Sequence, residues 1–494
     1  MSITNRFNKI LSTSLDKQIL GIKKNNTWDW INRKQLKNNI IYCIHVLKYN
    51  NIKVNHRVMY KGDNSINWIS WNIATNAIGA IWVPLYANQN DSYVNHIIND
   101  CEPSLLISKE KHYKNVRLQN DVIDPENYNH DIPINNNGII SNLIYTSGTT
   151  GKPKGVILTN DNILSNIDAI ETRFSNFTNE KQYTSLSILP WAHIYGMTAE
   201  LYYNLLNNNR IAISSGPTEF VKEIREIKPD FLYLVPRIMQ MIKTKIEIFD
   251  KPIVSKILPY ILNYVFGKNL QTIFMGGAQL DETTKHFYLN NGIMICEGYG
   301  CTETSPMISV NHTVEPRDIN SVGKILDNLI VKIINDEICV SGPSIMAGYW
   351  DNPKATNEVL INHNNKIFYK TGDEGYIKNG FLYYNGRFKE NYKLNNGKFV
   401  NINEIDNIVK QYTTLPFMVY GNNKLHNIII IEENSNIDKT ILNRINKKLK
   451  SFLHIKDILT VENNTFQKFM TPKMSLKRNE LEKFLQDKIN IIYQ

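Results

Sequence analysis

The stretch from Ile144 to Asn160, IYTSGTTGKPKGVILTN, concentrates hydroxyl groups, glycines and two lysines in one short span. Hydroxyls, backbone amides and ammonium groups are good ligands for phosphate oxygens, and glycines keep such a loop mobile. The composition therefore predicts a phosphate-binding loop. Its candidate contacts are Thr146, Ser147, Gly148, Thr149, Thr150, Gly151, Lys152 and Lys154.

The loop does not follow the Walker A pattern GxxxxGK[ST], whose last hydroxyl binds magnesium. Pro153 stands where that pattern needs Ser or Thr, and Thr146 stands where it needs its first glycine. A β-like run at 156–159 follows the loop, and a helix is expected only afterwards, with Asn160 or Asp161 as its cap. The sequence therefore predicts a strand–loop–strand hairpin that closes over a triphosphate.

The span YTSGTTGKPKGV resembles the signature loop of the adenylate-forming superfamily, which comprises acyl-CoA synthetases, peptide-synthetase adenylation domains and luciferases (the ANL enzymes). Further segments that resemble the family's motifs occur in family order across nearly the whole chain. The resemblance implies that the hairpin handles ATP for the formation of an acyl-adenylate.

Three further segments resemble the walls of the family's active site. LPWAHIYGMTAEL carries His193, which the resemblance places near the reacting carboxylate and the pantetheine tunnel. In EGYGCTETSP, Tyr299 can stack on adenine, Thr302 can bind the α-phosphate and Glu303 can bind magnesium. Taken alone, His193 is typical of a core histidine, and Thr302 with Glu303 is typical of a helix-capping pair. Together with MGGAQL, these walls predict nucleotide contacts at Gly277, Ala278, Glu297, Gly298, Tyr299 and Gly300.

The segments YKTGDEGYI and YNGRFKENYKL supply the next group of predicted contacts. Asp373 offers an anionic acceptor suited to ribose hydroxyls, and Arg387 matches the family arginine near the ribose and phosphates. Lys389 matches the hinge on which the small domain rotates, and Lys393 and Gly397 match the thioester-forming site. Without the resemblance, Arg387 and Lys389 would be typical of a solvated charged turn.

The C-terminal motif departs from the family pattern, in which the adenylation lysine belongs to a K-φ-x-R arrangement (φ is apolar). Aligning MTPKMSLKRN on Leu476 and Arg478 puts Ser475 at the lysine position, with Lys473 and Lys477 on either side. A compact cation would offset the charge that gathers between carboxylate and α-phosphate, and serine cannot supply it. Either Lys473 takes this role with a shifted loop, which is our assignment, or the first half-reaction is weakened.

The resemblance implies two half-reactions, with ATP, magnesium and coenzyme A as the small molecules. A carboxylate attacks the α-phosphate of ATP, and the thiolate of coenzyme A then displaces AMP. LPWAHIYG and MTPKMSLKR resemble long-chain acyl-CoA synthetases, so we expect a fatty acyl-CoA synthetase. The alternatives are a ligase for another carboxylic acid or a carrier-protein acceptor, and a catalytically weak paralogue that binds acyl groups or nucleotide. The acyl pocket should be apolar and built near His193, 233–239 and 301–307.

The elements that position these residues are expected to form an α/β fold of the acyl-CoA synthetase/luciferase type. From about residue 50 to 345, β-branched runs alternate with helical patterns, which is typical of parallel sheets. After Gly386 a charged turn-and-hairpin region begins. We expect a large AMP-binding N-terminal domain of parallel α/β sheets at residues 1–386 and a small mobile α+β domain at residues 387–494.

The composition indicates which binding partners and which cellular compartment to expect. The net charge of +10, from 56 basic and 46 acidic side chains, suits ATP and coenzyme A and permits peripheral association with a membrane surface. The lysines are scattered, and we predict no nucleic-acid partner. Five cysteines without a CxxC pair predict free thiols in a reducing compartment. No signal-peptide core or run of ~18 apolar residues occurs, so we expect a cytoplasmic protein.

Overall fold

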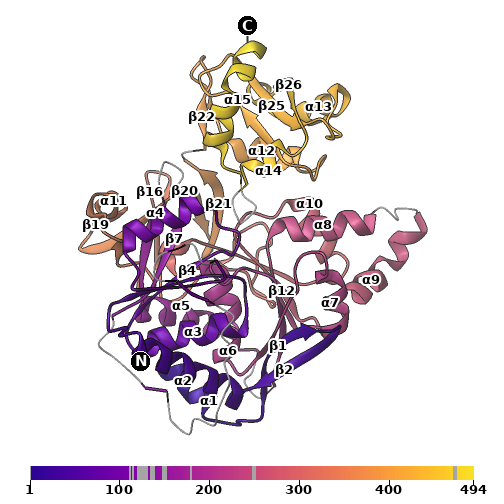
Figure 1. Ribbon diagram of the computed structural model, residues 1–494. Helices are drawn as coiled ribbons and strands as arrows, with labels where there is room; N and C mark the ends of the chain where they lie inside the picture. Colours follow the sequence, from indigo (N-terminus) through magenta and orange to yellow (C-terminus); the bar gives the residue numbers. More distant parts are fainter. Residues whose placement is uncertain are drawn as a thin grey trace.

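A computed structural model describes residues 2–110, 113, 116–118, 132–133, 139–146, 153–177, 181–247, 252–388, 390–470 and 476–493. A large sheet-rich body carries a smaller C-terminal part, drawn in orange and yellow at the top of Figure 1. Strand β21 (Phe381–Arg387) lies at their junction. This arrangement agrees with the predicted α/β fold, and residue 387 remains our proposed boundary between the two parts.

The larger sheet follows the order β16-β17-β20-β21-β15-β14-β13-β12-β11-β9-β10-β1-β2, with β19 paired to β20. The segment from β1 through β10, β9, β11 and β12 to β13 is parallel, as predicted. From β13 to β16 the described pairs are antiparallel, which the prediction of largely parallel sheets missed. The strands are β1 Gln18–Lys24, β2 Thr27–Asn32, β9 Thr184–Ser187, β10 Arg210–Ile213, β11 Phe231–Leu234, β12 Thr272–Met275, β13 Ile295–Gly300, β14 Met307–Val310, β15 Lys324–Ile325, β16 Ile330–Ile334, β17 Glu337–Ser341, β19 Leu360–His363, β20 Lys366–Lys378 and β21.

The second sheet has the order β18-β8-β7-β4-β3-β5-β6 and contains the predicted hairpin. Its pairs are parallel from β7 through β4 and β3 to β6, while β7–β8 and β8–β18 are antiparallel. The strands are β3 Arg57–Lys61, β4 Ile81–Leu85, β5 Leu105–Ser108, β6 Val116–Leu118, β7 Ile140–Thr146, β8 Lys154–Thr159 and β18 Gly348–Tyr349.

Helices α1, α2, α3 and α5 share one apolar core with side chains from both sheets. Within it, Trp68 packs edge to face against Trp82 and Trp191, with ring centroids 5.2 and 5.7 Å away. No helix in the described ranges is long and apolar enough to cross a membrane. The helices of this body are α1 Ile3–Leu11, α2 Arg33–Tyr49, α3 Ile66–Ala77, α4 Asp91–Cys101, α5 Asn160–Arg173, η1 Tyr195–Tyr202, α6 Tyr203–Leu206, α7 Phe220–Ile227, α8 Pro236–Glu247, α9 Pro252–Phe266, α10 Glu282–Leu289, η2 Thr302–Thr304 and α11 Pro353–Val359.

The C-terminal part packs its helices on a three-stranded sheet of order β24-β25-β26. The antiparallel pair β24–β25 stands between its helices α12 and α13. The elements are β22 Tyr392–Lys393, β23 Phe399–Val400, α12 Ile402–Val409, β24 Phe417–Tyr420, β25 Asn427–Glu432, α13 Lys439–Asn446, η3 Ser451–Leu453, β26 Ile455–Val461, α14 Thr465–Lys468 and α15 Arg478–Ile492.

Candidate functional site

The predicted strand–loop–strand hairpin is present as β7 and β8. Its last pair joins Thr146 to Lys154, directly at the mouth of the loop. The helix that follows is capped by Thr159, not by Asn160 or Asp161, because Thr159 Oγ1 accepts from Asn162 N at 3.1 Å and so satisfies a free amide. The loop residues themselves lie outside the described part of the chain: Ser147, Gly148, Thr149, Thr150, Gly151 and Lys152.

Asp373 and Tyr299 meet at the centre of the site, although 74 positions separate them in sequence. The Tyr299 hydroxyl donates to Asp373 Oδ2 at 2.6 Å, and β20 pairs Asp373 with Arg387 of β21. Arg387 Nε lies 3.3 Å from Asp373 Oδ1, but outside hydrogen-bond geometry, so this buried oxygen has no hydrogen bond from the described residues. The structure thus joins three predicted nucleotide contacts and leaves one acceptor for a hydroxyl donor such as a ribose.

Burial controls the ionisation of Asp373, which is 4% exposed. Desolvation raises the pKa of its carboxyl to about 6, while Arg387 and the Tyr299 hydroxyl act in the opposite direction. Repulsion from Glu390 and Glu303 is a smaller contribution to the same upward shift of the pKa. Asp373 is therefore an anion at neutral pH and becomes protonated in a mildly acidic solution.

Thr302 and Glu303 form a buried 3-10 turn, η2, that follows β13. The Tyr349 hydroxyl donates to Glu303 Oε1 at 2.9 Å, and this is the hydrogen bond that the described residues make to the Glu303 carboxylate. No cluster of three metal-ligating side chains occurs in the described ranges. One carboxylate with an uncommitted oxygen fits magnesium, which binds through one or two carboxylates and the phosphates of its nucleotide.

The two wall segments require glycine for different physical reasons. Gly277 is exposed with φ +81°, a left-handed conformation that favours glycine, and the neighbouring Ala278 is exposed as well. In β13, a Cβ atom on Gly300 would lie 1.8 Å from the Pro306 carbonyl oxygen. On Gly298 it would lie 3.2 Å from Ser309 O. The close approach of β14 therefore accounts for the glycines of this strand.

Glu297 is placed behind this wall. Its Oε1 accepts from Leu280 N at 3.1 Å, and its carboxylate forms an ion pair with Lys285. Both side chains are buried. These contacts hold Leu280, the last residue of the MGGAQL segment, and Lys285 against β13.

His193 lies just before η1, a buried π-helix. Its Nδ1 accepts from Tyr195 N at 3.2 Å, which leaves the proton of the neutral ring on Nε2. π-Helical turns are rare and occur often at functional sites. Tyr195, Ala199 and Tyr203 follow one another at intervals of four residues and line the same cavity.

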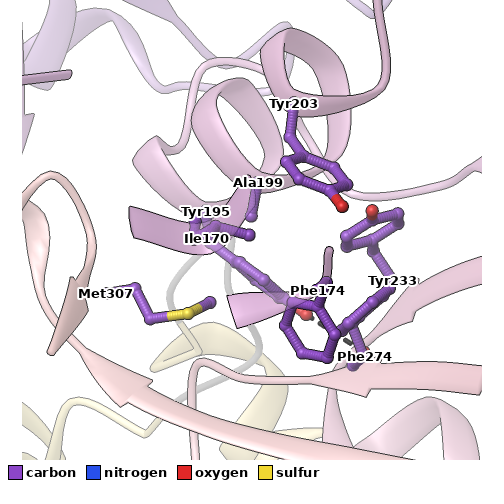
Figure 2. Close-up of a pocket in the computed structure, with 8 residues that line it drawn as sticks. All are labelled: Ile170, Phe174, Tyr195, Ala199, Tyr203, Tyr233, Phe274 and Met307. Carbon is purple, nitrogen blue, oxygen red and sulfur yellow. Dashed lines mark hydrogen bonds between the residues drawn. The ribbon is translucent and has the colours of Figure 1, made fainter. Parts of the chain in front are cut away.

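That cavity is walled by apolar side chains and aromatic rings (Figure 2). It holds about 10 Å³ of free space, room for about one water molecule. Phe274 closes one side, with ring centroids 5.0 Å from Phe174 and 4.9 Å from Tyr233. Its lining is Ile170, Phe174, Tyr195, Ala199, Tyr203, Tyr233, Phe274 and Met307. Three of these residues belong to or adjoin the segments where the sequence predicted an acyl pocket.

Glu200 is a buried carboxyl in η1 that the sequence analysis did not single out. Burial raises the pKa of its carboxyl well above the ordinary value of a glutamate. Ser187 of β9 donates to Glu200 Oε2 at 2.6 Å. The bond ties the π-helix to the parallel sheet; the sequence carries no signal for it, because only the fold brings the two side chains together.

The structure describes some, but not all, of the site residues that were predicted in the C-terminal part. Lys393 in β22 is exposed, and Gly397 in the following turn has φ +79° with nothing within 4 Å of its added Cβ. Lys477 pairs with Glu480 at 3.1 Å in the first turn of α15. Lys389 and Lys473 lie outside the described residues.

Comparisons with known proteins agree with this geometry. The family model of AMP-binding enzymes matches residues 12–350. Probable 4-coumarate–CoA ligase 1 of Dictyostelium discoideum is 33% identical over 50% of this chain and 44% of its own length. Long chain acyl-CoA synthetase 3 of Arabidopsis thaliana is 24% identical over 94% of this chain and 87% of its own length.

The fold is also that of a solved relative. The crystal structure of ATP-bound MatB from Rhodopseudomonas palustris superimposes with a TM-score of 0.80 over the full length of both chains, at 20% identity. The matched stretch covers less than half of the Dictyostelium ligase. The hairpin, the Tyr299–Asp373 pair and the matching family model together show that this chain belongs to the family of AMP-binding enzymes, within the adenylate-forming superfamily.

Proposed function

We propose that this protein activates a fatty acid with ATP through an acyl-adenylate and transfers the acyl group to coenzyme A. One observation carries the proposal: the apolar cavity and the nucleotide side of the site share one short segment. Thr302 and Glu303 stand on the nucleotide side, and Met307, four residues after Glu303, lines the cavity. A carboxylate whose apolar tail filled this cavity would meet the α-phosphate at that segment.

Different described residues would bind the ribose, the adenine, the magnesium and the phosphates of the nucleotide. Asp373 Oδ1 is an acceptor for a ribose hydroxyl, and the Tyr299 ring, held by its bond to Asp373, offers a face to adenine. Glu303 would hold magnesium, which offsets the negative charge of the phosphates when bound. Lys154 stands at the mouth of the hairpin, where an ammonium group attracts phosphate oxygens.

The walls of the cavity support an apolar acid. Its lining residues carry no charged side chain, and the Tyr195 hydroxyl is already bonded to Phe274 O at 3.0 Å. Burial of the acyl chain would stabilise binding by roughly 0.8 kcal/mol per methylene. A long chain needs these side chains to move, because the free space is about one water molecule.

A second candidate function is a ligase for a compact aryl acid, which would displace fewer of these side chains than a long chain. Phe174, Phe274 and Tyr233 form stacked and edge-to-face contacts that suit a flat ring better than a long flexible chain. The 33% identity to a probable 4-coumarate–CoA ligase over half of this chain favours the same class.

A product assay separates these candidates. The full chain is incubated with ATP, magnesium and coenzyme A, and with octanoate, palmitate or 4-coumarate in turn, and acyl-CoA is detected by mass spectrometry. Fatty acyl-CoA as the main product supports the first proposal, and coumaroyl-CoA supports the second. Acyl-adenylate without any acyl-CoA would indicate another thiol acceptor, such as a carrier protein. No product from any acid would favour the catalytically weak paralogue.

We also propose a cytoplasmic site of action, which fractionation of cells that express the full chain tests. Recovery in the soluble fraction supports it. Recovery in the pelleted membranes that is reversed by salt would indicate the peripheral association that the net charge of +10 permits.

A further inference from the structure

One short strand links the phosphate hairpin to the turn that carries Glu303. Strand β18 pairs antiparallel with β8, so that Tyr349 stands opposite Val156. Trp350 N donates to Gly155 O at 2.7 Å, at the base of the hairpin. On the other side, Met346 N donates to Glu303 O at 2.9 Å. The backbone around β18 therefore fixes the hairpin and η2 relative to each other.

The side chain of Tyr349 makes the same connection. Its hydroxyl donates to Glu303 Oε1 at 2.9 Å, and the Lys154 ammonium lies 5.1 Å from the centre of its ring. The residue is 8% exposed, and burial followed by the charge of Glu303 raises the pKa of its hydroxyl. Tyr349 therefore remains a hydrogen-bond donor throughout the neutral range, while its ring face attracts the ammonium.

We propose that Tyr349 is a positioning residue that prepares the Glu303 carboxylate and the Lys154 ammonium for magnesium–ATP. The hydroxyl holds Glu303 Oε1 and so directs the other carboxylate oxygen to the metal, while the ring keeps the Lys154 ammonium at the hairpin mouth. The inference rests on the proposed function, since it assigns Glu303 to magnesium and Lys154 to phosphate. No step of bond making involves the tyrosine itself.

The physical reason is pre-organisation. A carboxylate without a donor samples several rotamers and must be ordered when the metal arrives, whereas a hydrogen bond to one oxygen removes that cost beforehand. Hydrogen bonds to a charged group are about twice as strong as neutral ones. A lysine in solution is equally disordered, and the ring limits the space that its ammonium explores.

The test measures binding rather than turnover. Isothermal titration calorimetry follows a non-hydrolysable ATP analogue with and without magnesium, in wild type and in Tyr349→Phe, which retains the ring. We expect the magnesium concentration at half-saturation to rise about tenfold in the variant, while binding without magnesium stays unchanged. Tyr349→Leu removes the ring as well, so its affinity for the analogue should fall even without magnesium.

Tyr288→Phe is the matched control. Tyr288 is fully buried and donates to Met239 O at 2.7 Å, on elements away from η2 and the hairpin, so the variant should bind like wild type. A wild-type magnesium requirement in Tyr349→Phe would overturn the inference. If Tyr349→Phe fails to fold, Tyr349→Leu takes its place, and a wild-type magnesium requirement in that variant would contradict the inference as well. A wild-type protein that binds no ATP analogue would instead refute the proposed function.

Discussion

Asp373 is the residue whose ionisation should govern nucleotide binding. Because burial raises its pKa to about 6, its carboxyl is mostly protonated at pH 5 and loses the charge that a ribose hydroxyl would meet. We expect the dissociation constant of an ATP analogue to rise about tenfold between pH 7 and pH 5. Asp373→Asn should bind weakly and with no such dependence. A flat wild-type profile would contradict this assignment.

The Asp373 carboxyl also makes the free energy of unfolding depend on pH. Its folded pKa lies above the ordinary value of an aspartate, so between about pH 4 and pH 6 the folded state binds more protons. Unfolding free energy should therefore fall as pH rises through this window, by about 3 kcal/mol at most. Asp373→Asn should abolish that component in urea denaturation.

Individual site residues were predictable only where a motif fixes them. Tyr299 and Asp373 were both predicted from their motifs, but the bond between them could not be, because 74 positions separate them. Tyr349 was missed since its role depends on Glu303, 46 positions away, and its own neighbourhood contains no pattern of chemistry-bearing residues. Contacts of this kind follow from strand pairing, which one sequence does not specify.

At the scale of elements, β13 and β14 set the position of η2. Gly300→Ala would put a Cβ atom 1.8 Å from the Pro306 carbonyl oxygen, so the backbone must move and η2 with it. We expect a loss of more than about 2 kcal/mol in urea unfolding. Gly298→Ala on the same strand meets its nearest atom at 3.2 Å and should cost clearly less. Equal costs for the two variants would contradict this account of the strand.

The π-helix η1 and the sheet together form the cavity, which a larger side chain should fill. Ala199→Leu adds carbon atoms to a space of about one water molecule. We expect the Michaelis constant for the acid to rise at least tenfold, with overpacking costing about 1–3 kcal/mol of stability. Binding of the ATP analogue in the absence of acid is the control and should stay unchanged. Unaltered kinetics with every acid would exclude this cavity as the acyl pocket.

Elements were easier to predict than their pairing. The glycine-rich loop and the β-like run after it identified the β7–β8 hairpin, and the helix expected directly after that run is α5. The antiparallel half of the larger sheet was missed, because short β-branched runs look alike whichever way their neighbours run. The cap, predicted at Asn160 or Asp161, lies one or two residues earlier at Thr159, because helix ends are poorly defined by local sequence.

At the scale of the whole molecule, we propose that the C-terminal part supplies the cation that Ser475 cannot. Lys477 already pairs with Glu480 and so stabilises the start of α15. Lys473→Ala should therefore reduce acid-dependent adenylation at least a hundredfold, whereas Lys477→Ala should leave it within about twofold. The opposite ranking, measured as the rate of adenylate formation in a single turnover, would assign the role to Lys477.

We propose that the large body activates a carboxylate by forming an acyl-adenylate, and ATP–pyrophosphate exchange measures that step directly. The full chain is incubated with ATP, magnesium and labelled pyrophosphate, with each acid in turn and with none. We expect label in ATP only when a suitable acid is present, and we expect the exchange rate of Asp373→Ala to be strongly reduced. Failure of every fatty and aryl acid to promote exchange, or exchange that needs no acid, would contradict it.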